Sequence, residues 1–324
     1  MKRFQWAAVS GVLVLALGGA AGCGDSGGTG GGGSGSGGSQ VSGTIRVDGS
    51  STVGPLTEAV AEAFQGENAE VRVTVGTSGT GGGFEKFCAG ETDISDASRP
   101  IEDDEIAACK QQGITYEQFQ VANDGISVVV NSGNDWAKCL TTAQLKKIWD
   151  KGSSIGNWNQ VDSSFPDQKL TLYGPGTDSG TFDFFTDKIN GEEGRSRSDY
   201  NATEDDNVTV QGVSGDKGGL GYFGLSYLEQ NKDKLAGVQV DSGKGCVAPS
   251  TDTVQDGSYA PLSRPLFIYV KGSSLKKPEV EAFVQYYLDN TADLAEQALF
   301  VPLTAEQQAA LQPKLDALKS NAGT

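Results

Sequence analysis

Residues 44–64 read TIRVDGSSTVGPLTEAVAEAF and contain one complete strand–loop–helix unit. Apolar and polar residues alternate over 44–47, which predicts a β-strand. Glycine and hydroxyl residues fill the loop 48–54, and Pro55 suits the first turn of a helix. The large apolar residues after Pro55 recur every four positions, so they share one helix face. The stretch therefore predicts a strand whose loop leads directly into a helix N-terminus.

The same order of strand, loop and helix recurs three more times along the chain. The further loops lie at 76–83, 95–99 and 174–181, and their helices are expected to begin at Phe84, Pro100 and Phe182. Repeated units of this kind predict an α/β fold with doubly wound sheets, in which such loops meet at the carboxyl edge of the strands. Unpaired helix N–H groups and the positive ends of helix dipoles lie at that edge. The pattern predicts a site for a small anion that needs no basic patch.

The composition excludes several kinds of chemistry. The chain has 324 residues, with 25 basic and 42 acidic side chains, a formal charge of −17 and no histidine. This length suits about two domains. Without histidine, imidazole-based catalytic triads and histidine zinc sites are excluded, and the acidic balance argues against nucleic acid as a partner. We expect a binding protein without cofactor or metal rather than an enzyme.

The N-terminus has the features of a targeting segment. Residues 1–22 combine two basic residues, a short apolar stretch and small residues, which is typical of a signal peptide and too short for a membrane span. Small residues directly before Cys23 resemble a bacterial lipobox, with Ala20 where leucine is usual. The resemblance implies a lipid anchor on Cys23 at the extracellular face of the cell membrane; an unlipidated secreted chain is the alternative. The glycine-rich segment 23–41 is expected to be a flexible tether.

Four further cysteines are expected to form disulfides. They are Cys88, Cys109, Cys139 and Cys246. An even number in an exported chain favours two disulfides over metal ligands or free thiols, and four cysteines allow three pairings. We favour Cys88–Cys109, which would link neighbouring helices, and Cys139–Cys246, which would close a long loop in the second domain.

Taken together, the loops resemble the PstS family, the substrate-binding lipoproteins of phosphate ABC transporters. The segments that carry the resemblance are 48–53, 76–82, 96–101 (DASRPI, the mark of one branch), 176–181, 219–223 and 261–266. The resemblance implies a type 2 periplasmic-binding-protein fold, in which two doubly wound α/β lobes are joined by two crossover segments. Lobe 1 would comprise 42–125 and 262–324, and lobe 2 would comprise 126–261.

The resemblance also implies a set of phosphate contacts from three of the loops. These are Ser51, Thr52 and Val53, then Ser78, then Ser179, Gly180 and Thr181. The best-studied branch has an aspartate where this chain has Ser98 and an arginine where it has Pro175. We therefore expect Ser98 and Arg99 to face the ion, with Arg99 offering its planar fork to two oxygens. Arg99 could instead pair with a nearby acid such as Glu102 or Asp103.

The missing aspartate bears on selectivity. A buried carboxylate accepts a hydrogen bond from hydrogen phosphate, whereas sulfate has no proton to give and would leave that acceptor unpaired. The expected replacement is Asp124, with Asp96 as the alternative, although either could be a cap or turn residue. We predict that Asp124→Asn lowers the discrimination of phosphate over sulfate.

The expected function is capture of inorganic phosphate outside the cell and its delivery to the permease subunits of an ABC transporter by a monomeric protein. Ligand bound between the lobes would favour a closed state. Binding of another tetrahedral oxyanion, sulfate or molybdate, is the main alternative. A secreted phosphate-ester hydrolase with Ser51, Ser78 or Ser179 as nucleophile is a further one. The motif from Ser274 to Lys277 also fits SxxK, but its polar surroundings predict a surface position.

Overall fold

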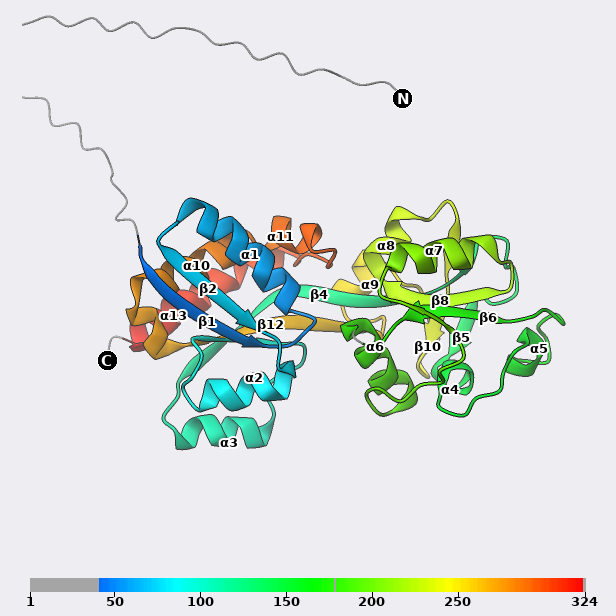
Figure 1. Cartoon of the computed structure of the whole chain (residues 1–324), viewed down its shortest axis with the longest axis horizontal. Coiled ribbons are helices and arrows are strands. Elements are labelled where there is room, and N and C mark those ends of the chain that lie inside the picture. Colours follow the sequence, from blue (N-terminus) through cyan, green and yellow to red (C-terminus); the bar gives the residue numbers. More distant parts are fainter. Residues whose placement is uncertain (1–40, 178, 323–324) are drawn as a thin grey trace, which may run out of the picture. The chain divides into compact units, whose positions relative to one another are not determined.

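The computed structural model describes residues 41–177 and 179–322. The expected signal peptide 1–22, Cys23 and nearly all of the expected tether 23–41 lie outside the described residues. Within the described part, nine strands form one sheet (Figure 1). Its order is β2 (Val71–Gly76), β1 (Gly43–Gly49), β3 (Ile94–Ala97), β12 (Ser263–Lys271), β4 (Tyr116–Asn131), β8 (Gly219–Gly224), β6 (Thr171–Pro175) and β7 (Asn201–Thr203), with β9 (Leu235–Gly237) paired to β4. A smaller sheet has the order β11 (Cys246–Val247), β10 (Gln239–Asp241) and β5 (Cys139–Thr141).

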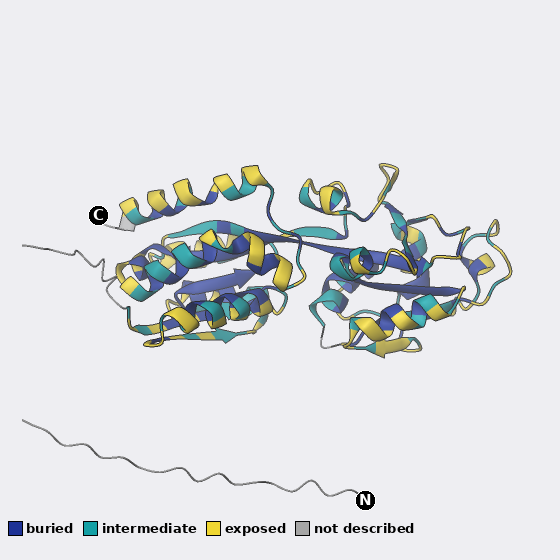
Figure 2. Cartoon of the chain, turned by 90° about the horizontal axis from the view of Figure 1, so that it is seen from above, coloured by how far each residue is buried: buried dark blue, intermediate teal, exposed yellow. Residues whose placement is uncertain are grey.

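The helices fall into two groups. Lobe 1 carries α1 (Gly54–Glu67), α2 (Gly79–Cys88), α3 (Asp103–Gln111), the 3₁₀ helix η2 (Gly272–Lys276), α10 (Pro278–Asp289), α11 (Thr291–Gln297), α12 (Ala305–Ala309) and α13 (Leu311–Ala322). Lobe 2 carries α4 (Thr142–Trp149), α5 (Trp158–Val161), α6 (Gly180–Phe185), the π-helix η1 (Thr186–Asn190), α7 (Asp206–Gly215), α8 (Leu225–Gln230) and α9 (Thr251–Gln255). Buried residues follow the strands and the inner helix faces (Figure 2).

Two chain segments join the lobes: β4 runs through both, and β12 begins where the chain returns to lobe 1. The first part of β4 pairs antiparallel with β12, from Tyr116 to Gly125, and its second part pairs with β8, from Ile126 to Val130. One strand thus belongs to both lobes. Its residues 121–130 are all buried, as expected for a strand covered on both faces. The expected α/β class, with two lobes joined by two crossing segments, is confirmed.

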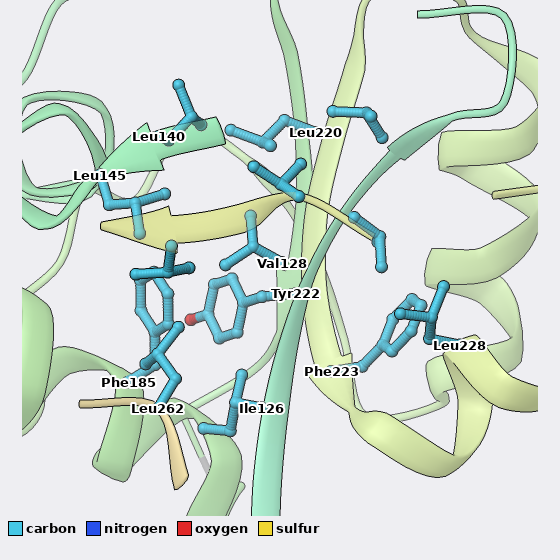
Figure 3. Close-up of a cluster of buried hydrophobic side chains, with 14 of the residues drawn as sticks. Ile126, Val128, Leu140, Leu145, Phe185, Leu220, Tyr222, Phe223, Leu228 and Leu262 are labelled. Atoms are coloured by element: carbon cyan, nitrogen blue, oxygen red, sulfur yellow. The ribbon is translucent and has the colours of Figure 1, made fainter. Parts of the chain in front are cut away.

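Each lobe has its own apolar core, because both faces of its sheet are covered. In lobe 1, Ile45, Leu56 and Phe283 belong to the cluster between the sheet and α1 and α10. A second cluster on the side of α2 and α3 includes Phe84, Phe87 and Tyr269. In lobe 2, Tyr222 stacks on Phe185 with ring centroids 3.8 Å apart, within a cluster that includes Ile126, Val128 and Leu262 (Figure 3).

Three helices begin at residues other than those expected. The helix expected at Phe84 begins at Gly79, and the one expected at Phe182 begins at Gly180 and continues as η1. The helix expected at Pro100 begins at Asp103. There the backbone N–H of Glu102 donates to the Glu105 carboxylate (2.8 Å), so a side chain from within the first turn fixes the start of the helix.

Both favoured disulfides are confirmed. Cys88 bonds to Cys109 and thereby joins α2 to α3, and Cys139 bonds to Cys246 across 107 residues. The second bond joins β5 to β11 in the smaller sheet, and so fixes two distant parts of lobe 2.

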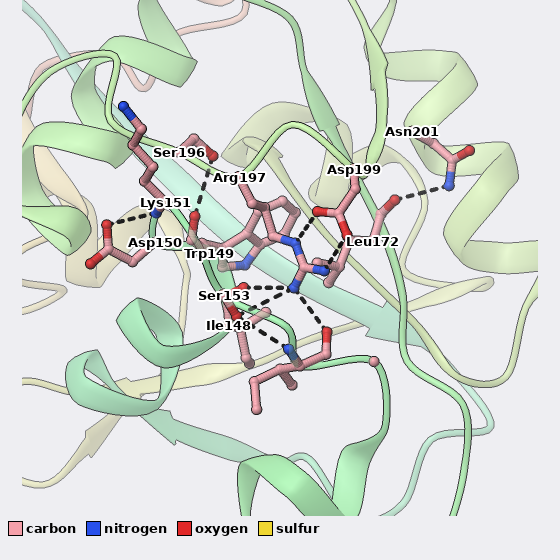
Figure 4. A network of polar contacts seen from close by, with 12 residues as sticks. Ile148, Trp149, Asp150, Lys151, Ser153, Leu172, Ser196, Arg197, Asp199 and Asn201 are labelled. Carbon is pink, nitrogen blue, oxygen red and sulfur yellow. Dashed lines mark hydrogen bonds and ion pairs between the residues drawn. The ribbon is translucent and has the colours of Figure 1, made fainter.

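A buried arginine organises the outer part of lobe 2 (Figure 4). Arg197 is 8% exposed. Its fork donates to both oxygens of Asp199 (2.6 and 2.8 Å), and its Nη1 donates to the carbonyls of Ile148 (3.0 Å) and Ile155 (2.8 Å). These bonds satisfy the carbonyl of Ile148 in the last turn of α4 and the loop carbonyl of Ile155. Arg197 is therefore a structural residue.

Among the described helices, none is both long and apolar enough to cross a membrane.

Candidate anion-binding site

A cavity of about 560 Å³ lies between the lobes, where the loops after the strands face each other. Lobe 1 contributes Ser50, Ser51, Thr52, Gly79, Thr80, Gly81, Ser98, Arg99 and Glu102. Lobe 2 contributes Gly180, Asp183, Phe184, Asp187, Lys188 and Glu193, and the crossing strand β12 contributes Arg264. Hydroxyls, glycines and helix N-termini dominate its lobe 1 side, as the loop pattern predicts.

The first loop is held tightly against the sheet. Gly49 has a φ of +149°, and a Cβ there would lie 2.1 Å from the backbone oxygen of Asp96. Only glycine permits this approach of β1 to β3. The Oγ of Ser50 then accepts the backbone N–H of Thr52 (3.2 Å), which orders the turn before α1. The hydroxyls of Ser51 and Thr52 are thereby directed to the cavity side.

The loops of the two lobes come together at Thr52 and Gly180. A Cβ on Gly180 would lie 2.6 Å from Thr52 Oγ1 and 3.6 Å from Ser51 Oγ. Beside Gly180, the Oγ of Ser179 accepts the backbone N–H of Thr181 (3.2 Å) and so caps α6. The N-termini of α1 and α6, which belong to different lobes, therefore face the same small volume.

Arg264 lies at this meeting point. Its Nε donates to Asp124 Oδ2 (3.0 Å) and its Nη2 donates to Thr52 Oγ1 (2.9 Å). Its guanidinium carbon lies 3.9 Å from the ring centroid of Phe184 in lobe 2. Burial lowers the pKa of Arg264 and Asp124 opposes that change, but an arginine stays protonated in proteins. The site thus has a fixed positive charge that contacts both lobes.

Arg99 lines the cavity but is held by acids of its own lobe. Its Nη1 and Nη2 donate to the two oxygens of Glu105 (2.8 Å each), and Nε lies 3.2 Å from Glu102 Oε1. The pairing left open by the sequence is therefore with Glu105 and Glu102. Since two carboxylates already surround Arg99, Arg264 is the better placed cation for an ion at the meeting of the loops.

Five of the expected contacts line the cavity: Ser51, Thr52, Ser98, Arg99 and Gly180. Ser179 and Thr181 flank Gly180 without being part of the lining. Val53 is fully buried in the lobe 1 core. The Ser78 hydroxyl donates to Asp48 and lies outside the lining. Asp124 also lies outside it and accepts from Arg264.

Sequence reasoning missed Arg264 and Asp183, which both line the cavity. A signal for Arg264 was present, because a charged residue stands two positions before Leu266, where the buried run of β12 begins, within segment 261–266. Asp183 lies in the first turn of α6. Burial raises the pKa of Asp183, the charge of Glu193 adds to this, and Arg264 opposes it.

Asp96, the alternative acceptor, is fully buried beneath the first loop rather than in the lining. Its Oδ1 accepts from Thr57 Oγ1 (3.0 Å), and its Oδ2 is without a hydrogen-bond partner among the described residues. Burial raises the pKa of Asp96 to about 8, the Thr57 bond opposes this, and the charges of Asp48 and Glu58 add to it. Burial therefore favours the protonated, neutral form of the Asp96 carboxyl.

A pH dependence of stability follows. Because the pKa of Asp96 is higher in the folded chain, its contribution is complete below pH 4 and is lost as the pH rises towards about 8. In Asp96→Asn, we expect the fall in unfolding free energy between pH 4 and pH 8 to be smaller by about 4–5 kcal/mol, because the pKa moves from 3.8 to about 8 on folding and each pKa unit is worth about 1.4 kcal/mol. Denaturant titrations at both pH values measure it. Asp256→Asn, at an exposed position, serves as the control, and equal falls in all three chains would contradict the assignment.

The SxxK motif is buried at its serine, contrary to the expected surface position. Ser274 is 4% exposed and its Oγ donates to Asp93 Oδ1 (2.7 Å). Lys277 Nζ donates to the same oxygen (2.8 Å). One carboxylate holds both groups, so the cluster ties η2 to the end of the lobe 1 sheet.

Comparison with known proteins agrees with this architecture. A family model described as a PBP superfamily domain matches residues 34–291. The phosphate-binding protein PstS of Staphylococcus saprophyticus is 43% identical over 322 residues, which cover 98% of this chain and 95% of that protein. Protein SphX of Synechococcus elongatus is 51% identical over 265 residues, 81% of this chain and 78% of that one. The crystal structure of a possible phosphate binding protein from Planctomyces limnophilus is 48% identical in sequence and superposes with a TM-score of 0.83. The match covers 86% of this chain and 99% of the chain in that structure.

Two α/β lobes, two crossing strands and a polar cavity between the lobes define a two-lobed solute-binding protein, in keeping with the PBP superfamily match. Relatives named PstS align with nearly the whole chain. The chain belongs to the PstS family.

Proposed function

We propose that this protein binds inorganic phosphate outside the cell and delivers it to the permease of an ABC transporter. The observation that carries the proposal is the meeting of Thr52 and Gly180 beside Arg264. Two helix N-termini supply N–H donors, the loop hydroxyls add further donors, and one buried guanidinium supplies charge. Such a set suits a tetrahedral oxyanion. Family membership favours phosphate among the oxyanions.

Around the ion, we propose contacts from Ser51 and Thr52 in lobe 1 and from Ser179, Gly180 and Thr181 in lobe 2, with Arg264 between them. Ser98 and Arg99 would form the lobe 1 rim. Because the contacts come from both lobes, ligand stabilises the position in which the lobes meet. The proposed division is lobe 1 at 42–125 and 262–324 and lobe 2 at 126–261. A lipid on Cys23 would keep the protein beside its permease.

Titration calorimetry on the chain, stripped of bound anion, tests the proposal with phosphate, sulfate and molybdate in parallel. We expect one phosphate per chain and binding at least 100-fold weaker for the other two ions, roughly 2.7 kcal/mol. Tighter binding of sulfate or molybdate would assign the site to that ion. Release of phosphate from a phosphate ester without stoichiometric phosphate binding would point to a hydrolase.

The carboxylate that selects phosphate is proposed to be Asp183. It lines the cavity, whereas Asp124 is engaged by Arg264. A carboxylate facing the ion accepts a hydrogen bond from hydrogen phosphate. Sulfate has no proton to donate, so the same carboxylate is left without a hydrogen-bond partner beside it. We expect Asp183→Asn to lower the ratio of phosphate to sulfate affinity by about tenfold. Competition calorimetry measures the ratio.

Asp124→Asn is the matched comparison for Asp183→Asn. Since Asp124 orients Arg264, its loss should weaken both anions and leave their ratio within about twofold. If Asp124→Asn instead lowered the ratio and Asp183→Asn did not, the selecting carboxylate would be Asp124, as the sequence alone suggests.

A further inference from the structure

The segment 299–303, between α11 and α12, contacts both lobes. Val301 exchanges two backbone hydrogen bonds with Asn123 of β4, with N···O distances of 2.9 and 2.8 Å. The Val301 side chain is 5% exposed and packs in the lobe 2 core, whereas Leu303, two residues on, packs in the lobe 1 core. Besides β4 and β12, this segment is thus a third connection between the lobes.

Two side chains of lobe 2 also bond to the segment. Ser226 Oγ of α8 donates to the carbonyl of Leu299, and Gln255 Nε2 of α9 donates to the carbonyl of Pro302 (2.8 Å). Leu299 has a φ of +63°. This left-handed conformation is unfavourable for leucine, and it persists only where surrounding contacts hold it. The end of α11 already supports this conformation, because the N–H groups of Leu299 and Phe300 donate to the carbonyls of Glu296 (3.0 Å) and Ala295 (2.8 Å). The bonds to lobe 2 add to these and fix the position of the segment.

The segment lies on the face of β4 opposite the anion site. Neighbouring side chains of a strand point to opposite faces. Asp124 bonds to Arg264, which lines the cavity, whereas Asn123 Nδ2 donates to the carbonyl of Pro302 (3.3 Å) on the other face. A groove between α9 and α12 lies along this side, with Gln255 and Gln307 in its lining.

We propose that segment 299–303 is an interlobe strap that stabilises the position in which Thr52 and Gly180 meet. It does so by holding α8 and α9 of lobe 2 against the crossing strands. This role rests on the proposed function, because the position that the strap favours is the one that surrounds the anion. The strap thereby raises anion affinity without touching the anion.

The test is the double variant Ser226→Ala with Gln255→Ala, which removes both side-chain bonds from lobe 2 to the strap. The control is Gln285→Ala with Gln312→Ala, which removes a bond between α10 and α13 inside lobe 1 (2.8 Å). We expect the strap variant to bind phosphate about 3- to 10-fold more weakly than the native chain. The phosphate affinity of the control variant should stay within twofold of that of the native chain.

Small-angle X-ray scattering of the same chains without phosphate gives an independent readout. The strap variant should have a larger radius of gyration than the native chain, and the control should match the native chain. If the strap variant kept the radius of gyration and the phosphate affinity of the native chain, or bound phosphate more tightly, the proposed role of the strap would be wrong. If the native chain binds no phosphate, the proposed function fails, while the radius of gyration still decides whether the strap holds the lobes together.

Discussion

Replacing Arg264 by glutamine is expected to weaken phosphate binding by roughly 10²- to 10⁴-fold. A guanidinium can donate two charge-assisted bonds to an oxyanion, and each is worth about 1.5–3 kcal/mol. The variant also leaves the Asp124 carboxylate, 11% exposed at its side chain, without its charged partner behind the cavity lining. Calorimetry with phosphate measures the loss. Arg264→Lys should recover only part of it, because an ammonium lacks the planar fork.

Arg197→Gln is the matched control for this variant. Arg197 is equally a buried arginine paired with an aspartate, but it bonds to lobe 2 loops outside the cavity lining. Its loss should lower the unfolding temperature and leave phosphate affinity within about threefold. Should both arginine variants lose affinity together, the effect would come from unfolding of the chain, and Arg264 would have no special place in the site.

Much of the fold could be predicted from local patterns in the sequence. Alternating apolar residues, hydroxyl-rich loops and helix faces are short-range features, so the strand–loop–helix units and the meeting of their loops were accessible. The residues at which helices begin were harder to predict from the sequence. The start at Asp103 depends on Glu105 reaching back to the N–H of Glu102, and Pro100 gives a competing signal for the start of the same helix.

The cation of the site could not be assigned in this way. Arg264 meets Asp124 because β12 and β4 pair in a particular register, which places residues 140 apart in sequence opposite each other. Arg99 lies in a loop of the expected kind, and the sequence therefore predicts that Arg99 is the cation of the site. Its three contacts with Glu102 and Glu105 depend on where α3 begins. Long-range register and the exact start of a helix are both set by tertiary packing.

The second large effect is expected from Gly180→Ala, the addition of one methyl group where the lobes meet. The new Cβ would lie 2.6 Å from Thr52 Oγ1, a distance at which the atoms overlap. Thr52 cannot simply rotate away, since its hydroxyl accepts from Arg264. Either that bond breaks or the lobes move apart, and both remove donors from the ion. We expect phosphate affinity to fall by about 10- to 100-fold, with little change in unfolding temperature.

Gly81→Ala separates the overlap from any general effect of the substitution. Gly81 lines the same cavity, but a Cβ there would lie 3.7 Å from Arg99 Nη2, an ordinary contact distance. Alanine also favours the helix around it. Affinity in Gly81→Ala should therefore stay within about twofold of the native chain. Equal affinities in the native chain, Gly81→Ala and Gly180→Ala would mean that bound phosphate does not require Thr52 and Gly180 to approach, and the ion would then have to be held by one lobe alone.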